Sequence, residues 1–160
     1  MMRYITKSLF LLVSVLVLLA CNKPSRVEQY KAEKHIKDSI GLFEQERTLT
    51  YYQSQLENLM PVADSLIALF KYEKNDKYQD HGYYVLSRNE LRLLVRDDGK
   101  DLLIYRDGKR INGDGLKGKD LELLDRAEHL QIVISDVNEL EKRIKKTSLE
   151  VQKYQKRLQK

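Results

Sequence analysis

The sequence is poor in the residues that build most catalytic and metal sites. Its 160 residues include no tryptophan, one cysteine, three histidines and two prolines. A lone cysteine, Cys21, excludes an intramolecular disulfide. His35, His81 and His129 lie far apart, at no metal-ligand spacing. We therefore expect no enzyme activity, no metal site and no cofactor.

Glycine is scarce as well, and five of the seven glycines fall between residues 99 and 118. Asp97-Asp98-Gly99 and Asp107-Gly108 are typical of tight turns between strands. The density of aspartate and glycine suggests a calcium loop, but the spacing opposes it. Eleven residues after Asp97 stands Gly108, where a helix-loop-helix calcium site needs a bidentate glutamate. These glycines therefore indicate turns, and no phosphate-cradling loop is present.

Charge is abundant but nearly balanced. Asp, Glu, Lys and Arg make up 33% of the chain, and the formal net charge is +5. Arg3 and Lys7 lie in a segment that we expect to be removed, which leaves +3. A charge of that size does not indicate nucleic-acid binding. With so little proline and glycine, the composition predicts a charged helical protein.

The first twenty residues have the pattern of a signal peptide. Residues 1–7 carry Arg3 and Lys7 and no acid, and residues 8–20 are almost wholly apolar. This apolar run is shorter than the roughly 20 residues that span a bilayer, and it suits the hydrophobic region of a signal peptide. We expect residues 1–20 to be that peptide.

The signal region ends in Leu18-Leu19-Ala20-Cys21. This resembles the lipobox of bacterial lipoproteins, which has leucine at minus three, a small residue at minus one and then the cysteine. The resemblance covers the signal region alone. It implies cleavage before Cys21, acyl chains such as palmitate on that residue, and an address in the cell envelope. Asn22 in place of aspartate favours the periplasmic side of the outer membrane in a diderm host. The alternatives are a plain secretory signal with a chance cysteine and an uncleaved anchor.

Residues 130–158 carry the strongest periodic pattern. Apolar residues alternate there at spacings of three and four for four heptads, which places them on one narrow stripe of a helix. We call these nine positions the seam: Leu130, Val133, Val137, Leu140, Ile144, Thr147, Val151, Tyr154 and Leu158. A stripe this narrow predicts a partner helix, and residues 117–160 are expected to form the second helical arm.

Residues 26–79 are expected to form the first helical arm, after a tether at 21–25. Ser25 and Glu28 have the spacing of a capping box at its start. The regular spacing recurs at Leu49, Tyr52, Leu56, Leu59, Ala63, Leu66 and Phe70. Ile36, Ile40 and Phe43 share a face that is out of phase with this series, so we expect a stutter between Phe43 and Leu49.

Pro61 lies inside the first arm. It removes one backbone donor and crowds the preceding turn. Because the spacing keeps its phase across Pro61, we expect a kink, and the alternative is two helices that meet near Met60.

Between the arms, residues 80–116 change to the two-residue period of strands. In residues 91–96, Leu91, Leu93 and Val95 alternate with Arg92 and Arg96. We expect an antiparallel meander of three strands at residues 83–87, 91–96 and 102–106, with a short fourth at 109–111 as the alternative. One face should pack on the helices, because three strands alone are marginal.

The sequence thus predicts a mainly α fold: a long antiparallel, coiled-coil-like helical hairpin with a small antiparallel β-meander inserted at its tip. Counting helix rise down both arms places Lys160 opposite about Asp38, some 20 Å from the membrane that holds Cys21.

This architecture favours a lipid-anchored envelope scaffold or spacer that presents its β-tip to an unidentified protein partner. The sequence also leaves open that the protein forms homo-oligomers. The second hypothesis is a cell-wall-binding or wall-linked lipoprotein that uses a basic C-terminal helix: Lys142, Arg143, Lys145, Lys146, Lys153, Lys156, Arg157 and Lys160. Its layout is similar to that of the murein lipoprotein of enteric bacteria. The third is a small-ligand binder at a tyrosine-rich helix-sheet junction: Tyr51, Tyr52, Tyr72, Tyr78, Tyr83 and Tyr84.

Overall fold

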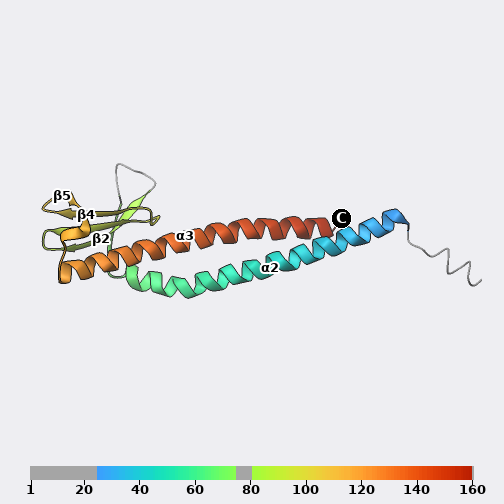
Figure 1. The fold of residues 1–160 in the computed structure, drawn as a ribbon, viewed down its shortest axis with the longest axis horizontal. Coiled ribbons are helices and arrows are strands. Elements are labelled where there is room, and N and C mark those ends of the chain that lie inside the picture. The colour runs from blue at the N-terminus through green and yellow to red at the C-terminus, as the bar shows by residue number, and fades with distance from the viewer. Residues whose placement is uncertain (1–24, 75–80, 160) are drawn as a thin grey trace, which may run out of the picture. The chain divides into compact units, whose positions relative to one another are not determined.

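The computed structural model describes residues 25–74 and 81–159 (Figure 1). Two helices have an antiparallel sheet between them in the chain, so the fold is mainly α. The elements are α2 (Arg26–Ile67), β1 (Lys71–Lys74), β2 (Gly82–Arg88), β3 (Leu91–Arg96), β4 (Leu102–Arg106), β5 (Lys109–Ile111), a 3-10 turn η1 (Gly113–Gly115) and α3 (Lys119–Leu158). The chain divides into two units, one of residues 1–43 with 154–160 and one of residues 44–153.

The predicted signal peptide, residues 1–20, and Cys21 lie outside the described residues. Within the described ranges, no helix is long and apolar enough to cross a membrane.

The capping box at the start of α2 is confirmed. The backbone N–H of Ser25 donates to the Glu28 carboxylate at 2.7 Å, and the N–H of Glu28 donates to the Ser25 hydroxyl at 3.2 Å. These bonds satisfy two of the donors that a helix leaves free at its N-terminus. Further on, α2 continues through Pro61 as one helix, so the alternative of two helices meeting near Met60 is wrong.

The first arm ends earlier than predicted. The helix stops at Ile67, and its last turn closes with tighter bonds from Leu69 and Phe70 to carbonyls three residues back. The next residues form β1, which pairs antiparallel with β2. The prediction of helix as far as residue 79 is therefore corrected. The residues of β1 pair with residues 8 to 14 positions further along the chain, and local periodicity does not reveal such a partner.

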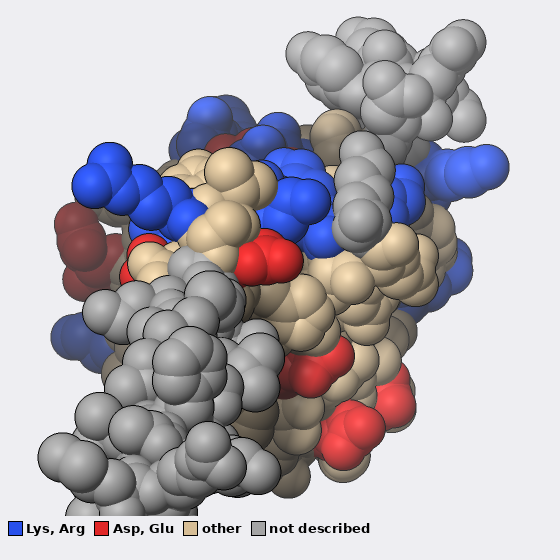
Figure 2. Space-filling model, turned by 90° about the vertical axis from the view of Figure 1, so that its right-hand side faces the viewer, with Lys and Arg blue, Asp and Glu red and all other residues tan. Residues whose placement is uncertain are grey.

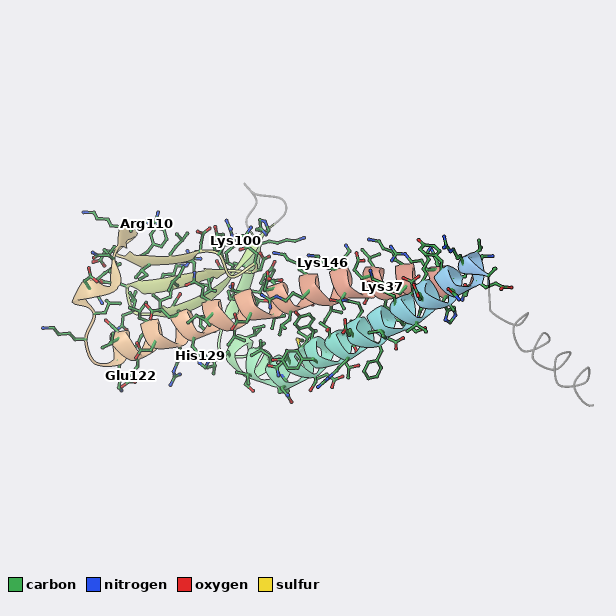
Figure 3. The ribbon with its side chains drawn as sticks, turned by 45° about the vertical axis from the view of Figure 1, so that its right-hand side comes forward. Lys37, Lys100, Arg110, Glu122, His129 and Lys146 are labelled. Atoms are coloured by element: carbon green, nitrogen blue, oxygen red, sulfur yellow. The ribbon has the colours of Figure 1, made fainter. Side chains whose placement is uncertain are left out.

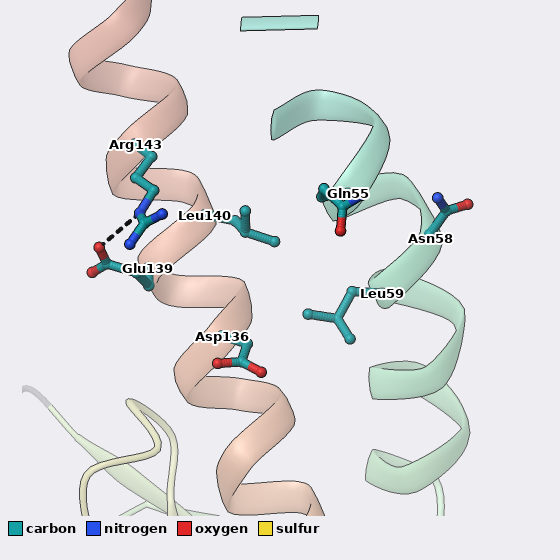
Figure 4. A pocket seen from close by; sticks show the side chains of 7 residues that line it. All are labelled: Gln55, Asn58, Leu59, Asp136, Glu139, Leu140 and Arg143. Carbon is teal, nitrogen blue, oxygen red and sulfur yellow. Dashed lines mark hydrogen bonds and ion pairs between the residues drawn. The ribbon is translucent and has the colours of Figure 1, made fainter. Parts of the chain in front are cut away.

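The seam is confirmed in both units. None of its nine residues is exposed, and Leu130, Val133, Thr147 and Val151 are buried. In the second unit, Leu59 of α2 and Leu140 of α3 point toward each other (Figure 4), and the Arg143 guanidinium lies 5.8 Å from the centre of the Tyr52 ring. The seam of α3 thus packs on the matching stripe of α2 in this unit.

The first unit tests the predicted alignment of the two helices, which placed Lys160 opposite Asp38. In the structure, Arg157 lies 3.7 Å from Asp38, so the observed alignment differs from the predicted one by three residues, less than one helical turn. The ring of Tyr154 lies against Gly41, where an added Cβ would stand 2.7 Å from the ring.

The expected stutter in α2 does not occur, because the out-of-phase apolar face that it would have brought into the packed stripe stays exposed. Ile36, Ile40 and Phe43 do share a face, but they are 59%, 55% and 67% exposed. Half-buried Asp38 and Gly41 continue the phase of the packed stripe instead.

The sheet has five antiparallel strands in the order β1-β2-β3-β4-β5, so the prediction of three or four is corrected. The predicted strands are all present, and β1 is the additional one. The alternation in β3 is also confirmed: Leu91, Leu93 and Val95 are buried and Arg92 is exposed.

One face of the sheet, which we call the inner face, packs on the first half of α3 (Figure 3). Leu93 lies between Leu86 and Ile104 in neighbouring strands. The fully buried core is built from both elements: Leu91, Leu93, Val95 and Ile104 of the sheet, Leu116 after η1, and Leu124, Ala127, Leu130 and Ile134 of α3.

Both edges of the sheet are short and basic. β1 has four residues and carries Lys71 and Lys74, and β5 has three residues and carries Lys109 and Arg110.

Candidate protein-binding surface

The opposite face of the sheet, which we call the outer face, has an apolar row across three strands. Val85 pairs with Leu94, and Leu94 pairs with Leu103. Val85 is buried, and the two leucines are half-buried. None of the described helices covers this face (Figures 1 and 3). Within the row, Leu94 and Leu103 therefore keep part of their apolar surface accessible in the second unit.

Tyrosine and arginine side chains border this row. Tyr83 pairs with Arg96 at one end, and Tyr105 lies between Arg92 and Arg110 at the other. These residue types are enriched in the centres of protein–protein interfaces, where they supply a large contact area and several donors.

Two of the three arginines are already paired. Arg92 forms an ion pair with Glu73 of β1. Arg96 donates to Asp98 at 2.6 Å and lies 2.6 Å from Asp101. Arg110, by contrast, has no hydrogen bond or ion pair with any described residue.

Asp97 organises the end of the sheet next to these groups. Its Oδ2 accepts from the Gly82 N–H at 2.7 Å and from the Tyr72 hydroxyl at 3.0 Å, and its Oδ1 lies 3.1 Å from His81 Nδ1. An ionised carboxylate only accepts hydrogen bonds, so this contact needs the proton on Nδ1 and leaves Nε2 of His81 without a role in it. The hydrogen bond that the Tyr72 hydroxyl donates to Asp97, together with burial, raises the pKa of Tyr72.

A hollow of about 350 Å³ opens on the outer face beside this cluster. Side chains from β2, β3, β4 and β5 meet at it. Its lining residues are His81, Tyr83, Arg96, Asp101, Leu103 and Arg110.

Another cleft, of about 400 Å³, lies beside the packed helices in the second unit (Figure 4). Leu59 and Leu140 form its apolar floor, and Glu139 accepts from Arg143 at 3.0 Å on its rim. Since Arg143 and Glu139 are paired with each other and the apolar part of the cleft belongs to the packed stripes, we interpret this cleft as a margin of helix packing.

The turn between β3 and β4 contains the most perturbed acid. Burial alone would raise the pKa of the Asp98 carboxyl, but hydrogen bonds from the Arg96 guanidinium and the Lys100 N–H outweigh burial and lower the pKa to about 2. The carboxylate is 17% exposed. A lowered pKa in the folded protein stabilises the fold above the unfolded value of 3.8, and this stability is lost as the pH falls toward 2.

Asp98→Asn should therefore lower the free energy of unfolding by about 1 to 2 kcal/mol at pH 7, since solvent screens part of the interaction. The difference from the wild type should shrink between pH 4 and pH 2. Urea unfolding followed by circular dichroism measures both. Asp125→Asn, at an exposed position of α3, is the matched control and should show no difference at either pH. A difference for Asp98→Asn that is constant with pH would contradict the assignment.

The structure separates the predicted tyrosine cluster. Tyr51 and Tyr52 lie on α2 with ring centres 5.8 Å apart, and Tyr72 and Tyr84 contact at 5.3 Å. Tyr84 packs against the core of the inner face, whereas Tyr83 lies on the outer face. Tyr78 lies outside the described residues. The described tyrosines thus form no single binding face.

The predicted histidine positions differ in environment. His35 and His129 are exposed on α2 and α3, and His81 contacts Asp97. Within residues 25–74 and 81–159, no group of three or more His, Cys, Asp or Glu side chains could hold a metal ion.

Basic residues of the C-terminal helix are exposed where the structure describes them. Arg143 and Lys153 pair with Glu139 and Glu150. Lys160 lies outside the described residues. Figure 2 shows lysine and arginine side chains interspersed with acidic and uncharged ones on the face that it draws.

Sequence reasoning missed the outer-face hollow. Its residues come from positions 81 to 110 and belong to no motif, and their meeting depends on the register of four strands. The alternation of residues 91–96 was the one sequence feature that pointed toward this hollow. It distinguished the side of the strand that carries Arg92 and Arg96 from the buried side.

No protein-family model, curated protein sequence or solved structure matches the chain.

Proposed function

We propose that this chain is a non-enzymatic, lipid-anchored scaffold of the bacterial envelope that holds a protein partner on its β-sheet. The observation that carries the proposal is the outer face, where an apolar row is bordered by Tyr83, Tyr105 and Arg110. A face of this composition suits a protein surface better than a small molecule.

The two arms would act as the spacer. We propose that they pack along their whole length as an antiparallel, coiled-coil-like hairpin, with the sheet at the end far from the anchor. The protected seam in both units supports this arrangement. At ~1.5 Å of rise per residue, the 40 residues of α3 span about 60 Å, and the half that does not pack on the sheet would serve as the spacer.

The anchor would be acylated Cys21, for which the lipobox resemblance is the support. Two or more acyl chains hold a protein stably at a membrane, at ~0.8 kcal/mol per buried methylene. Cys21→Ser should move the protein from the membrane to the soluble fraction and abolish the lipid mass of the mature chain. Fractionation and intact-mass spectrometry test this. A variant that remains in the membrane would contradict the anchor.

Wall binding is the second candidate. Lys142, Lys145, Lys146 and Lys156 are exposed and form no ion pair or hydrogen bond with the described residues, so they are available to an anionic polymer. In the same fractionation, wild-type protein that stays with peptidoglycan after boiling in detergent would favour this candidate. The scaffold proposal expects full extraction. Ligand binding at the tyrosines stays a prediction without structural support.

Photo-crosslinking in intact cells tests the scaffold. A photoreactive amino acid at position 105, on the outer face, should yield one discrete adduct with another protein. The same group at position 132 should not, because Ile132 is 58% exposed on α3 but lies away from the outer face. Leu94→Lys, which charges the apolar row, should remove the adduct from position 105 while leaving the melting curve in place. Equal adducts from both positions would contradict the proposal.

A further inference from the structure

The charged groups around the outer-face hollow are paired with one another, with one exception among the described residues. Asp98 and Asp101 are balanced by Arg96 and by Lys100, which lies 3.5 Å from Asp98. His81 lies against Asp97. Each of these charged side chains thus has at least one partner of opposite charge or a hydrogen bond within the group.

The exception is Arg110. It stands on β5 opposite Tyr105, lines the hollow, and has no hydrogen bond or ion pair among the residues that the structure describes. Figure 3 labels it on the sheet. A guanidinium presents several donors in a planar fork that matches a carboxylate in two parallel hydrogen bonds. Arg110 is therefore a guanidinium at the hollow that is available to a ligand, and its geometry selects planar oxyanions.

The other walls fit the rest of an acidic side chain. Leu103 and the ring of Tyr83 supply an apolar surface for methylene groups, and Asp97 holds the His81 ring in place as a further wall. Arg96 is held by two acids, so it shapes the hollow rather than binding a ligand. About 350 Å³ is enough for one side chain of a partner and too small for a folded segment.

We propose that the partner inserts an aspartate or glutamate side chain into this hollow, where its carboxylate pairs with Arg110. The proposal rests on the scaffold function and specifies its partner: a protein with an acidic side chain flanked by apolar residues that cover the row of Val85, Leu94 and Leu103. The carboxylate would fix the register of the partner on the outer face, and the apolar row would supply contact area.

The histidines allow a test in the isolated protein, residues 22–160. Only three imidazoles are present, so each can be followed by NMR. His81 reports the hollow, while His35 and His129 are exposed on helices and serve as internal controls. The probe is the blocked peptide acetyl-Leu-Glu-Leu-amide, and the matched control peptide replaces its glutamate with glutamine.

With the glutamate peptide, the His81 signals should shift saturably in the millimolar range, and those of His35 and His129 should stay fixed. The glutamine peptide should bind at least about tenfold more weakly. Arg110→Gln should weaken binding of the glutamate peptide to the same degree. Lys109→Gln removes the same charge from the neighbouring edge residue, which does not line the hollow, and should bind as the wild type does.

Equal losses in Arg110→Gln and Lys109→Gln would show diffuse charge attraction and overturn the proposal, as would equal binding of the two peptides. Because Arg110 is exposed at an edge, its replacement should leave the melting curve unchanged. The result is separable from the scaffold test. Loss of the adduct from position 105 in cells bears on the scaffold, and peptide binding bears on the hollow alone.

Discussion

Gly99→Ala is expected to lower the free energy of unfolding of the second unit by about 2 to 4 kcal/mol. Two effects add at this position. Gly99 has φ of +71°, which costs a residue with a Cβ about 1 kcal/mol. In addition, a Cβ there would lie 2.6 Å from the backbone nitrogen of Ser135 and 2.9 Å from the carbonyl oxygen of Gln131. A helix backbone cannot move aside as a side chain can, so the turn itself must shift away from α3.

Gly108→Ala is the matched control for the close approach. Its φ of +73° is nearly the same, but an added Cβ would meet no atom within 4 Å. This variant should lose only about 1 kcal/mol. Urea unfolding of both variants, followed by circular dichroism, gives the difference. Equal losses would mean that the β3–β4 turn does not rest on α3.

Leu130→Ala is expected to have a comparable or larger effect, about 3 to 5 kcal/mol. The Leu130 side chain is 0% exposed, and it begins the seam while also belonging to the core beneath the sheet. Truncation would leave a cavity where the sheet and α3 both contribute walls, so neither can close it alone. The melting temperature and the urea midpoint should both fall.

Ile132→Ala, two residues further along the same helix, provides the comparison. Ile132 is 58% exposed, and alanine favours the helix slightly more than isoleucine does. Its stability should stay within about 0.5 kcal/mol of the wild type. If the two variants were equally destabilised, the heptad positions would not distinguish packed from exposed residues.

The sequence predicted best those features that local spacing controls. The capping box of Ser25 and Glu28 and the burial of the seam follow from residues within one or two helical turns of each other. The alternation of Leu91, Leu93 and Val95 is likewise local. In each case the periodicity itself identifies the buried side of the element.

Features that depend on distant partners could not be predicted in the same way. The sequence of β1 lacks a clear alternation of apolar and polar residues, and this strand forms because it pairs with β2. Ile36, Ile40 and Phe43 show the reverse case: their spacing correctly defines a face, but spacing alone cannot say whether that face is covered. The hollow beside Arg110 combines both difficulties, because it needs the register of four strands and the pairing of every other charge.

The basic, short edges of the sheet have a consequence for a protein held at a membrane, as proposed here. Anchoring confines molecules to two dimensions, where neighbouring copies meet often and an open strand of one can extend the sheet of the next. Lys71 and Lys74 line the β1 edge, and Lys109 and Arg110 line β5, which offers only three residues for pairing. Like charges on apposed edges disfavour such polymerisation. A crowded leaflet would then contain separate molecules, with their outer faces accessible, rather than cross-β chains.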